Sequence, residues 1–430
     1  MPGTVSEKVL GHLAGRPVRP GEIVTVEPHV VMSHDNTSFI VDAFRETGYP
    51  RVWDPERLVV IFDHCVPATD PRHAQNHRDA ADFAREQGLP HFFGTTAGVC
   101  HQVMCERGFA LPGTLVLGAD SHSTLYGALG AFGVPINRTE MAGVWATGEI
   151  WLKVPESLRI QLSGRLRPGV SAKDLVLRLL RELRADGAAY QTLEFHGPAV
   201  AGLSISERMT LCNMAVELGA KAGIVPADAR TLDYLRARRG TPEARAFPAD
   251  WEQGLARAVP DPDARYAQTH RVDLDALEPQ VACPHTVDNV TDLSAVAGTA
   301  VHQGYLGSCT NGRLEDLALA ADVVRGRTLQ VPLYVYPASV EVLEQAEAQG
   351  VLSTLRAAGA EVMTASCGPC FGTVGATLGA GQVCISSSNR NFQGRMGHAQ
   401  SEVYLSSPAV VAASCLAGEI ADARPYLEGA

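Results

Sequence analysis

No stretch of this 430-residue sequence is apolar for long enough to cross a membrane or to direct secretion. The N-terminal residues 1–21 instead carry Val5, Val9, Leu10 and Leu13 at the spacing of an amphipathic helix. We therefore expect a soluble, cytoplasmic protein that has no membrane partner.

The chain is also poor in cysteine and in charge. Ten cysteines are too sparse for a disulfide scaffold, so we expect reduced thiols that are free for metal binding or catalysis. Charged residues make up 19% of the chain and hydrophobic residues 46%, which excludes a disordered protein and predicts two or three globular domains. The formal net charge of -11 disfavours nucleic acid as a partner, and a small anionic substrate would need a locally basic pocket.

Short β-branched runs that end in polar or small residues predict buried parallel strands. Amphipathic stretches lie between them, and this alternation is typical of a doubly wound α/β protein. The runs are residues 58–62, 114–117, 333–336 and 382–385, and the amphipathic stretches are residues 72–87, 314–325 and 340–358. We predict an α/β fold with doubly wound, largely parallel sheets.

The alternation appears in two blocks, at residues 1–155 and 297–430. The middle block, residues 156–296, contains helix candidates at residues 171–185 and 206–221. We expect three domains with these bounds.

Ligands bind beyond the carboxyl ends of the strands in open α/β sheets. The polar residues that follow the predicted strands are therefore candidates for a functional site. They are Asp63-His64, Asp120-Ser121-His122, Ser308-Cys309-Thr310-Asn311, Ser366-Cys367-Gly368-Pro369-Cys370 and Ser388-Asn389-Arg390.

Cys367 and Cys370 form a C-x-x-C pair, and Cys309 stands at the end of an earlier strand. Three thiolates can hold three irons of a [4Fe-4S] cluster and leave the fourth iron open as a Lewis acid. Cys-Gly-Pro-Cys is also the tetrapeptide of thioredoxin-like redox pairs, and structural zinc is a further alternative that needs a fourth ligand. The residues alone leave these alternatives open.

Carboxylates accompany several histidines, as in Asp63-His64 and Asp120-x-His122, with His101 between them in the sequence. A carboxylate can orient and charge an imidazole for proton transfer, which favours a catalytic interpretation over a structural one. Glu217, four residues after Asn213 on a predicted helix, is a candidate partner for a remaining histidine, although a solvated helix face explains that pair equally well.

The segment after the last predicted strand contains Arg390 and Arg395 beside a glycine. The planar guanidinium group forms paired, charge-assisted hydrogen bonds with carboxylates. Structural salt networks use the same bonds, but the segment lies in the same block as the cysteines. We predict that it contacts an acidic substrate.

With these residues assembled, the chain resembles the aconitase superfamily, most closely its large subunits of the 3-isopropylmalate dehydratase and homoaconitase type. The resemblance runs nearly end to end. Its strongest segments are Phe62-Asp-His-Cys-Val-Pro67, Gly98-Val-Cys-His-Gln102, Gly118-Ala-Asp-Ser-His-Ser123, Gly127-Ala-Leu-Gly-Ala-Phe132, Gly307-Ser-Cys-Thr-Asn311, Cys367-Gly-Pro-Cys370 and Ser388-Asn-Arg-Asn-Phe-Gln-Gly-Arg395.

The resemblance implies a three-domain α/β/α architecture and a lyase with one [4Fe-4S] cluster in which one iron is not ligated by protein. It implies that Cys309, Cys367 and Cys370 ligate the cluster and that Asn213 and Asn389 contact it. It also implies three pairs that handle protons, which are Asp63 with His64, Asp120 with His101, and Glu217 with His122. The substrate contacts that it implies are Ser121, Arg390 and Arg395.

Members of the superfamily use a serine base from a swivelling domain that carries a Gly-Ser-Ser-Arg motif, and this sequence has no such motif. The resemblance therefore implies a separate small subunit, in a heterodimer or heterotetramer. The segment His34-Asp-Asn-Thr-Ser38 resembles isopropylmalate enzymes of leucine biosynthesis, whereas residues 133–140 depart from the family's glycine-rich run.

Isomerisation of 2-isopropylmalate is the function that the sequence predicts first. A homoaconitase of lysine biosynthesis, or a hydratase of a related C5 to C7 diacid, is the alternative within the family. Outside it, we weigh a cluster-bearing RNA-binding regulator and a thiol oxidoreductase that uses Cys367 and Cys370.

Overall fold

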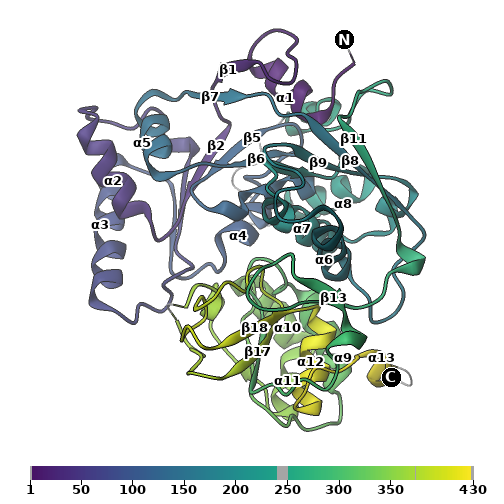
Figure 1. Ribbon diagram of the computed structural model, residues 1–430. Coiled ribbons are helices and arrows are strands. Elements are labelled where there is room, and N and C mark those ends of the chain that lie inside the picture. The colour runs from purple at the N-terminus through teal and green to yellow at the C-terminus, as the bar shows by residue number, and fades with distance from the viewer. Residues whose placement is uncertain (1, 240–249, 373, 428–430) are drawn as a thin grey trace.

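The computed structural model describes residues 2–239, 250–372 and 374–427. Figure 1 shows three bodies of mixed helix and strand, with the purple to blue N-terminal part beside the teal middle part and the green to yellow C-terminal part below both. In the described residues each body contains one larger sheet, and a fourth sheet has only two strands. Helix α1 (Val5–Leu13) precedes a two-stranded antiparallel ribbon of β1 (Ile23–Val26) and β7 (Ile150–Lys153).

The first sheet has five parallel strands in the order β4-β3-β2-β5-β6. Side chains on its two faces alternate between two cores, because Val31 and Val60 pack with α2, α3 and α5 while Met32 and Val59 pack with α4 and the middle body. The strands are β2 (Val30–Ser33), β3 (Leu58–Ile61), β4 (His91–Gly94), β5 (Leu115–Gly118) and β6 (Phe132–Pro135), and the helices are α2 (Thr37–Glu46), α3 (Pro71–Gln87), α4 (Cys100–Glu106) and α5 (Arg138–Thr147).

The middle sheet has four parallel strands in the order β10-β9-β8-β11, so this block is also α/β, although its strands were not predicted. Its elements are β8 (Ser157–Ser163), β9 (Thr192–His196), β10 (Ala222–Ile224), β11 (Gln268–Asp273), α6 (Ala172–Leu183), α7 (Ile205–Asn213) and α8 (Ala229–Arg239). The helix predicted over residues 206–221 is too long, because α7 ends at Asn213 and a 3-10 turn (Met214–Leu218) follows, closed by Gly219 at φ 80°.

The third sheet has the order β13-β12-β18-β17-β14-β15-β16, and only the pairings made by β12 are antiparallel. The helix predicted over residues 340–358 is two helices, because Gly350 at φ 75° separates α10 from α11. The elements are β12 (Gln280–Ala282), β13 (Val290–Asp292), β14 (Gln303–Leu306), β15 (Leu333–Val335), β16 (Glu361–Val362), β17 (Val383–Ser386), β18 (Glu402–Leu405), α9 (Leu314–Val324), α10 (Val340–Ala348), α11 (Val351–Ala358), α12 (Pro408–Ala417) and α13 (Arg424–Leu427).

The predicted α/β class with largely parallel sheets is therefore confirmed. For the domains, we propose three units that correspond to the three sheets. Because β12 and β13 pair within the third sheet, we place the second boundary between residues 273 and 280 instead of near residue 296. In the part of the chain that the structure describes, every helix is too short or too polar to cross a membrane.

A buried carboxyl group joins the first body to the third. Glu106 accepts hydrogen bonds from Gln102 Nε2 at 2.8 Å and from Ser339 Oγ at 2.7 Å, and Ser339 caps α10. Burial raises the pKa of Glu106 to about 7. The folded protein therefore binds this proton more tightly than the unfolded chain does, and stability is lost as pH rises through 7.

Replacing Glu106 with glutamine keeps an acceptor oxygen and removes this titration. We expect the variant to gain up to about 3 kcal/mol in unfolding free energy relative to wild type between pH 5 and pH 8, since one pKa unit corresponds to roughly 1.4 kcal/mol. Urea unfolding of the apoprotein at both pH values measures this difference. If the unfolding free energies of the variant and wild type differed by the same amount at pH 5 and pH 8, the raised pKa of Glu106 would be contradicted.

Candidate active site

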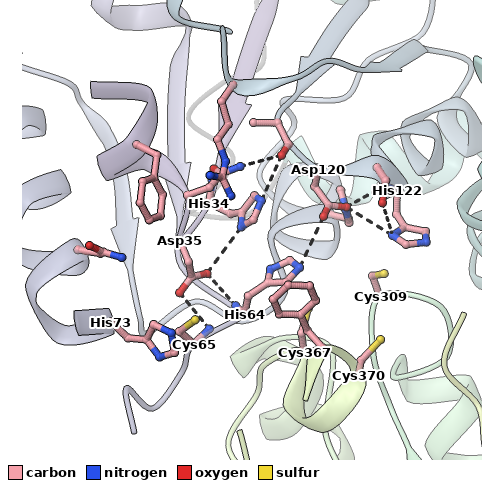
Figure 2. A pocket seen from close by; sticks show the side chains of 18 of the residues that line it. His34, Asp35, His64, Cys65, His73, Asp120, His122, Cys309, Cys367 and Cys370 are labelled. Atoms are coloured by element: carbon pink, nitrogen blue, oxygen red, sulfur yellow. Dashed lines mark hydrogen bonds and ion pairs between the residues drawn. The ribbon is translucent and has the colours of Figure 1, made fainter. Parts of the chain in front are cut away.

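The carboxyl ends of strands from the first and third sheets open onto one cavity of about 880 Å³. Figure 2 shows Cys309, Cys367 and Cys370 on one side of it, facing His64, Asp120 and His122. Most of the residues that the sequence suggested line this cavity, namely His64, His101, Asp120, Ser121, His122, Cys309, Cys367, Cys370, Asn389, Arg390 and Arg395. The other three, Asp63, Asn213 and Glu217, are buried behind the wall and contact residues that line it.

The three thiols are brought together from two loops of the third sheet. Cys309 follows β14, Cys367 directly precedes a 3-10 turn (Gly368–Phe371), and Cys370 lies within that turn. All three side chains are buried yet line the cavity, and none is in a disulfide. Burial raises the pKa values of Cys309 and Cys367. A catalytic redox pair needs a thiol of lowered pKa, so this site suits thiols that are deprotonated by a bound metal.

Amide groups surround the sulfur atoms. Asn213 and Asn389 each donate a hydrogen bond from Nδ2 to Cys309 Sγ at 3.2 Å, and Cys370 Sγ donates to Asn389 Oδ1 at 3.3 Å. Such N–H donors stabilise negative charge on sulfur. The donor set therefore fits an iron–sulfur cluster: three sulfur ligands, amide donors at one of them, and space at the mouth of the cavity.

His64 is held in a charged form by carboxylates. Its Nδ1 lies 2.7 Å from Asp63 Oδ1, and its Nε2 lies 3.6 Å from Asp120 Oδ2. Burial opposes a charge on this ring, but attraction from Asp63 and then Asp120 outweighs burial and raises the pKa of His64 to about 10. His64 is consequently a proton donor at neutral pH.

The two other carboxylate and histidine pairs are also formed. His101 Nε2 lies 2.7 Å from Asp120 Oδ1, and His122 Nε2 lies 2.8 Å from Glu217 Oε1. Burial disfavours charge on these two carboxylates, yet the histidines hold the pKa of Asp120 well below its usual range and lower that of Glu217. Arg390 Nε also forms an ion pair with Glu217 at 2.8 Å.

A buried lysine that the sequence did not suggest supports the same loop. Lys173 is fully buried in α6, and its ammonium group donates hydrogen bonds to the carbonyl oxygens of Ser387 and Ser388. These two residues directly precede Asn389 and Arg390. Lys173 therefore anchors the loop that carries both residues to the middle body.

His34 and Asp35 also line the cavity, although the sequence named them only in a segment that bears on the substrate and gave them no role. They follow β2, a strand of four residues that was not predicted. Asp35 accepts hydrogen bonds from the backbone N–H groups of Asp63 at 2.8 Å, His64 at 2.7 Å and Cys65 at 3.0 Å. Had β2 been predicted, the rule of polar residues at strand ends would have found both.

Donor atoms of His34, Asp35, Asp63 and His64 lie within 4.8 Å of one another, the arrangement of a candidate ion site. Both carboxylates, however, are already engaged. Asp35 holds the turn that carries His64, and Asp63 accepts from the Cys100 backbone N–H at 2.8 Å as well as facing the His64 ring. We therefore infer that this group orients His64.

Three thiols line one cavity together with three histidines that are paired with carboxylates, and these are the groups that a metal-dependent acid–base enzyme uses. A model of the aconitase family (aconitate hydratase) matches residues 7–302 and 294–418. The chain belongs to the aconitase family, and it is a hydro-lyase. Membership of the family implies a [4Fe-4S] cluster, and the identification replaces the thiol oxidoreductase alternative.

The relatives are similar over their whole length. The chain is 48% identical over 427 residues to "3-isopropylmalate dehydratase large subunit 1" of Methanopyrus kandleri, covering 99% of each chain. It is 47% identical over 394 residues to "Probable methanogen homoaconitase large subunit" of Methanosarcina mazei, covering 91% of this chain and 97% of the other. It is 45% identical over 422 residues to "Homoaconitase large subunit" of Thermus thermophilus, covering 96% of each.

Proposed function

We propose that this chain is the cluster-carrying large subunit of a hydro-lyase that isomerises a 2-hydroxy diacid by dehydration and rehydration. The observation that carries the proposal is the meeting of three thiols with the charged His64 pair around one cavity. Relatives named as large subunits of two such enzymes support it.

Cys309, Cys367 and Cys370 would hold the cluster, and Asn213 and Asn389 would donate to its sulfur ligands. When bound, the cluster supplies a Lewis acid, one iron without a protein ligand, for the hydroxyl and carboxylate of the substrate.

The protein's own groups move the protons. His64 donates its Nε2 proton to the departing hydroxyl, which leaves as water, while Asp63 stabilises the charged ring. Arg390 and Arg395 hold carboxylate oxygens of the substrate, because guanidinium groups bind carboxylates with fixed geometry, and Ser121 donates a hydrogen bond to the substrate from its hydroxyl group. Rehydration of the unsaturated diacid at the neighbouring carbon completes the isomerisation.

The carbon-bound proton is removed by a serine of a separate small subunit in this proposal. The described residues that line the cavity include one serine, Ser121, and it lies 3.3 Å from His122 Nδ1. A heterodimer or heterotetramer with a swivelling small subunit would complete the site.

Two substrates are candidates. The segment from His34 to Ser38 favours 2-isopropylmalate, converted to 3-isopropylmalate, as in leucine biosynthesis. Homocitrate, converted to homoisocitrate, is the second candidate. The observation that favours it is Arg138 on the cavity wall, which forms no ion pair with any residue that the structure describes.

The test is turnover by the purified chain, reconstituted with iron and sulfide without oxygen and mixed with small subunits of both enzyme types. We expect isomerisation of one candidate by the mixture and less than about one per cent of that rate by the chain alone. Full turnover without a small subunit would remove the partner from the proposal. No turnover of any hydroxy acid by a cluster-loaded mixture would overturn the proposed reaction.

A further inference from the structure

Four arginines among the described residues line the cavity, and they differ in whether a carboxylate of the protein already neutralises them. Arg72 forms an ion pair with Asp70 at 2.9 Å, and Arg390 forms one with Glu217 at 2.8 Å. Arg138 and Arg395 form no side-chain hydrogen bond or ion pair with any residue that the structure describes. Two uncompensated cations therefore face the same space.

Each uncompensated guanidinium group is held over an exposed phenylalanine. Arg138 Cζ lies 4.6 Å from the ring centre of Phe39, and Arg395 Cζ lies 5.6 Å from that of Phe371. Phe39 is 46% exposed and Phe371 is 54% exposed. A ring under the cation restricts the guanidinium group without neutralising it, so its N–H donors stay available to a ligand.

Strand order explains why Arg138 meets Phe39. Arg138 begins α5 directly after β6, and Phe39 lies in the first turn of α2 after β2. In the sheet, β5 lies between β2 and β6, and β5 leads into Asp120, Ser121 and His122. The Arg138 and Phe39 pair consequently flanks the strand end that carries candidate catalytic groups, while Arg395 and Phe371 come from the third body.

We propose that Arg138 binds a third acidic group of the substrate, carried on its side chain. This inference rests on the proposed function, in which Arg395 and Arg390 serve the two carboxylates that all candidate diacids share. Glu217 contacts only Nε of Arg390, so that its terminal amino groups form no ion pair with a described residue and can face the substrate. Arg138 then remains a cation without an anionic ligand, unless the side chain of the substrate carries a negative charge. A branched alkyl group placed there would desolvate the guanidinium group without compensation.

Arg138 favours homocitrate as the substrate, whereas residues 34–38 favour 2-isopropylmalate. A side chain that ends in a carboxylate, as in homocitrate, satisfies Arg138, whereas the isopropyl group of isopropylmalate does not. Residues 133–140 depart from the family pattern, and Arg138 within them lines the cavity. The departure would then change the substrate specificity through Arg138.

The experiment compares two unreactive acids, tricarballylate with three carboxylates and isopropylsuccinate with two carboxylates and a branched alkyl group. Their dissociation constants are measured by calorimetry on the full chain after reconstitution with iron and sulfide. We expect wild type to prefer tricarballylate, and Arg138→Ala to weaken tricarballylate about tenfold or more, since a charged hydrogen-bonded contact contributes roughly 1.5 to 3 kcal/mol. Isopropylsuccinate should change by less than about twofold.

Arg72→Ala is the matched control, because Arg72 lines the same cavity but is already paired with Asp70. It should alter neither constant. The inference is overturned by an equal loss for both acids in Arg138→Ala, by no loss, or by a wild-type preference for isopropylsuccinate. These acids are not turned over, so their binding is measured independently of activity. Binding that depends on Arg138 in a protein without hydro-lyase activity would refute only the proposed reaction. Hydro-lyase activity in a protein whose binding does not depend on Arg138 would refute only this inference.

Discussion

Replacing His64 with asparagine is expected to lower kcat by a factor of about 10² to 10⁴, the usual contribution of a positioned general acid. Asparagine is close to histidine in size and keeps an amide donor, but it cannot deliver a proton. The pair with Asp63 at 2.7 Å, which keeps His64 protonated, is lost with the ring. The cluster should remain, because none of its proposed ligands changes.

The measurement is kcat of the complex with its small subunit, alongside iron content and the visible spectrum of the same sample. His73→Asn is the matched control, since His73 lines the same cavity but forms no ion pair with a carboxylate among the described residues. We expect the control to keep its kcat within a few-fold. An active His64→Asn enzyme with an intact cluster would show that another group delivers the proton.

Replacing Cys309 with alanine is expected to abolish the cluster and to reduce turnover by at least about 10³-fold, because metal-assisted catalysis is lost together with its ligand set. Four cysteines line the cavity in the described part of the chain, which are Cys65, the residue after His64, and the three proposed ligands. Cys309 is also the sulfur that receives both asparagine N–H groups. Its loss therefore removes one of three proposed ligands and leaves two buried amide donors without their acceptor.

Cys384→Ala provides the control for the general effect of losing a buried thiol. Cys384 is fully buried in β17, in the same sheet as the cluster loops, and does not line the cavity. We expect it to bind iron like wild type. Full iron and sulfide content in Cys309→Ala would remove Cys309 from the ligand set.

Much of the site was predictable because its residues follow strands that are themselves easy to recognise. The runs around residues 59 and 116 are continuous and β-branched, as strands covered on both faces are. Asp63, His64 and Asp120 follow those strands directly. Parallel strands bring their carboxyl ends to one edge, so these residues had to lie near one another.

Other features depend on contacts that the sequence pattern does not contain. The pairing of His122 with Glu217 spans 95 positions and joins the first body to the middle body, so the resemblance suggested it and the residues alone did not. His34 and Asp35 were named only in a segment that bears on the substrate, because no strand was predicted at residues 30–33. The contact of Arg138 with Phe39 follows from strand order, which places β5 between β2 and β6, and strand order is decided by packing of the whole sheet.

The central claim is that three cysteines of this chain hold a [4Fe-4S] cluster at the His64 cavity. It is tested most directly by counting iron and acid-labile sulfide per chain, with the visible spectrum, on protein purified and reconstituted without oxygen. We predict about four irons and four sulfides per chain with the broad visible absorption of such a cluster. A chain that binds no iron after reconstitution would contradict the claim and the hydration chemistry built on it.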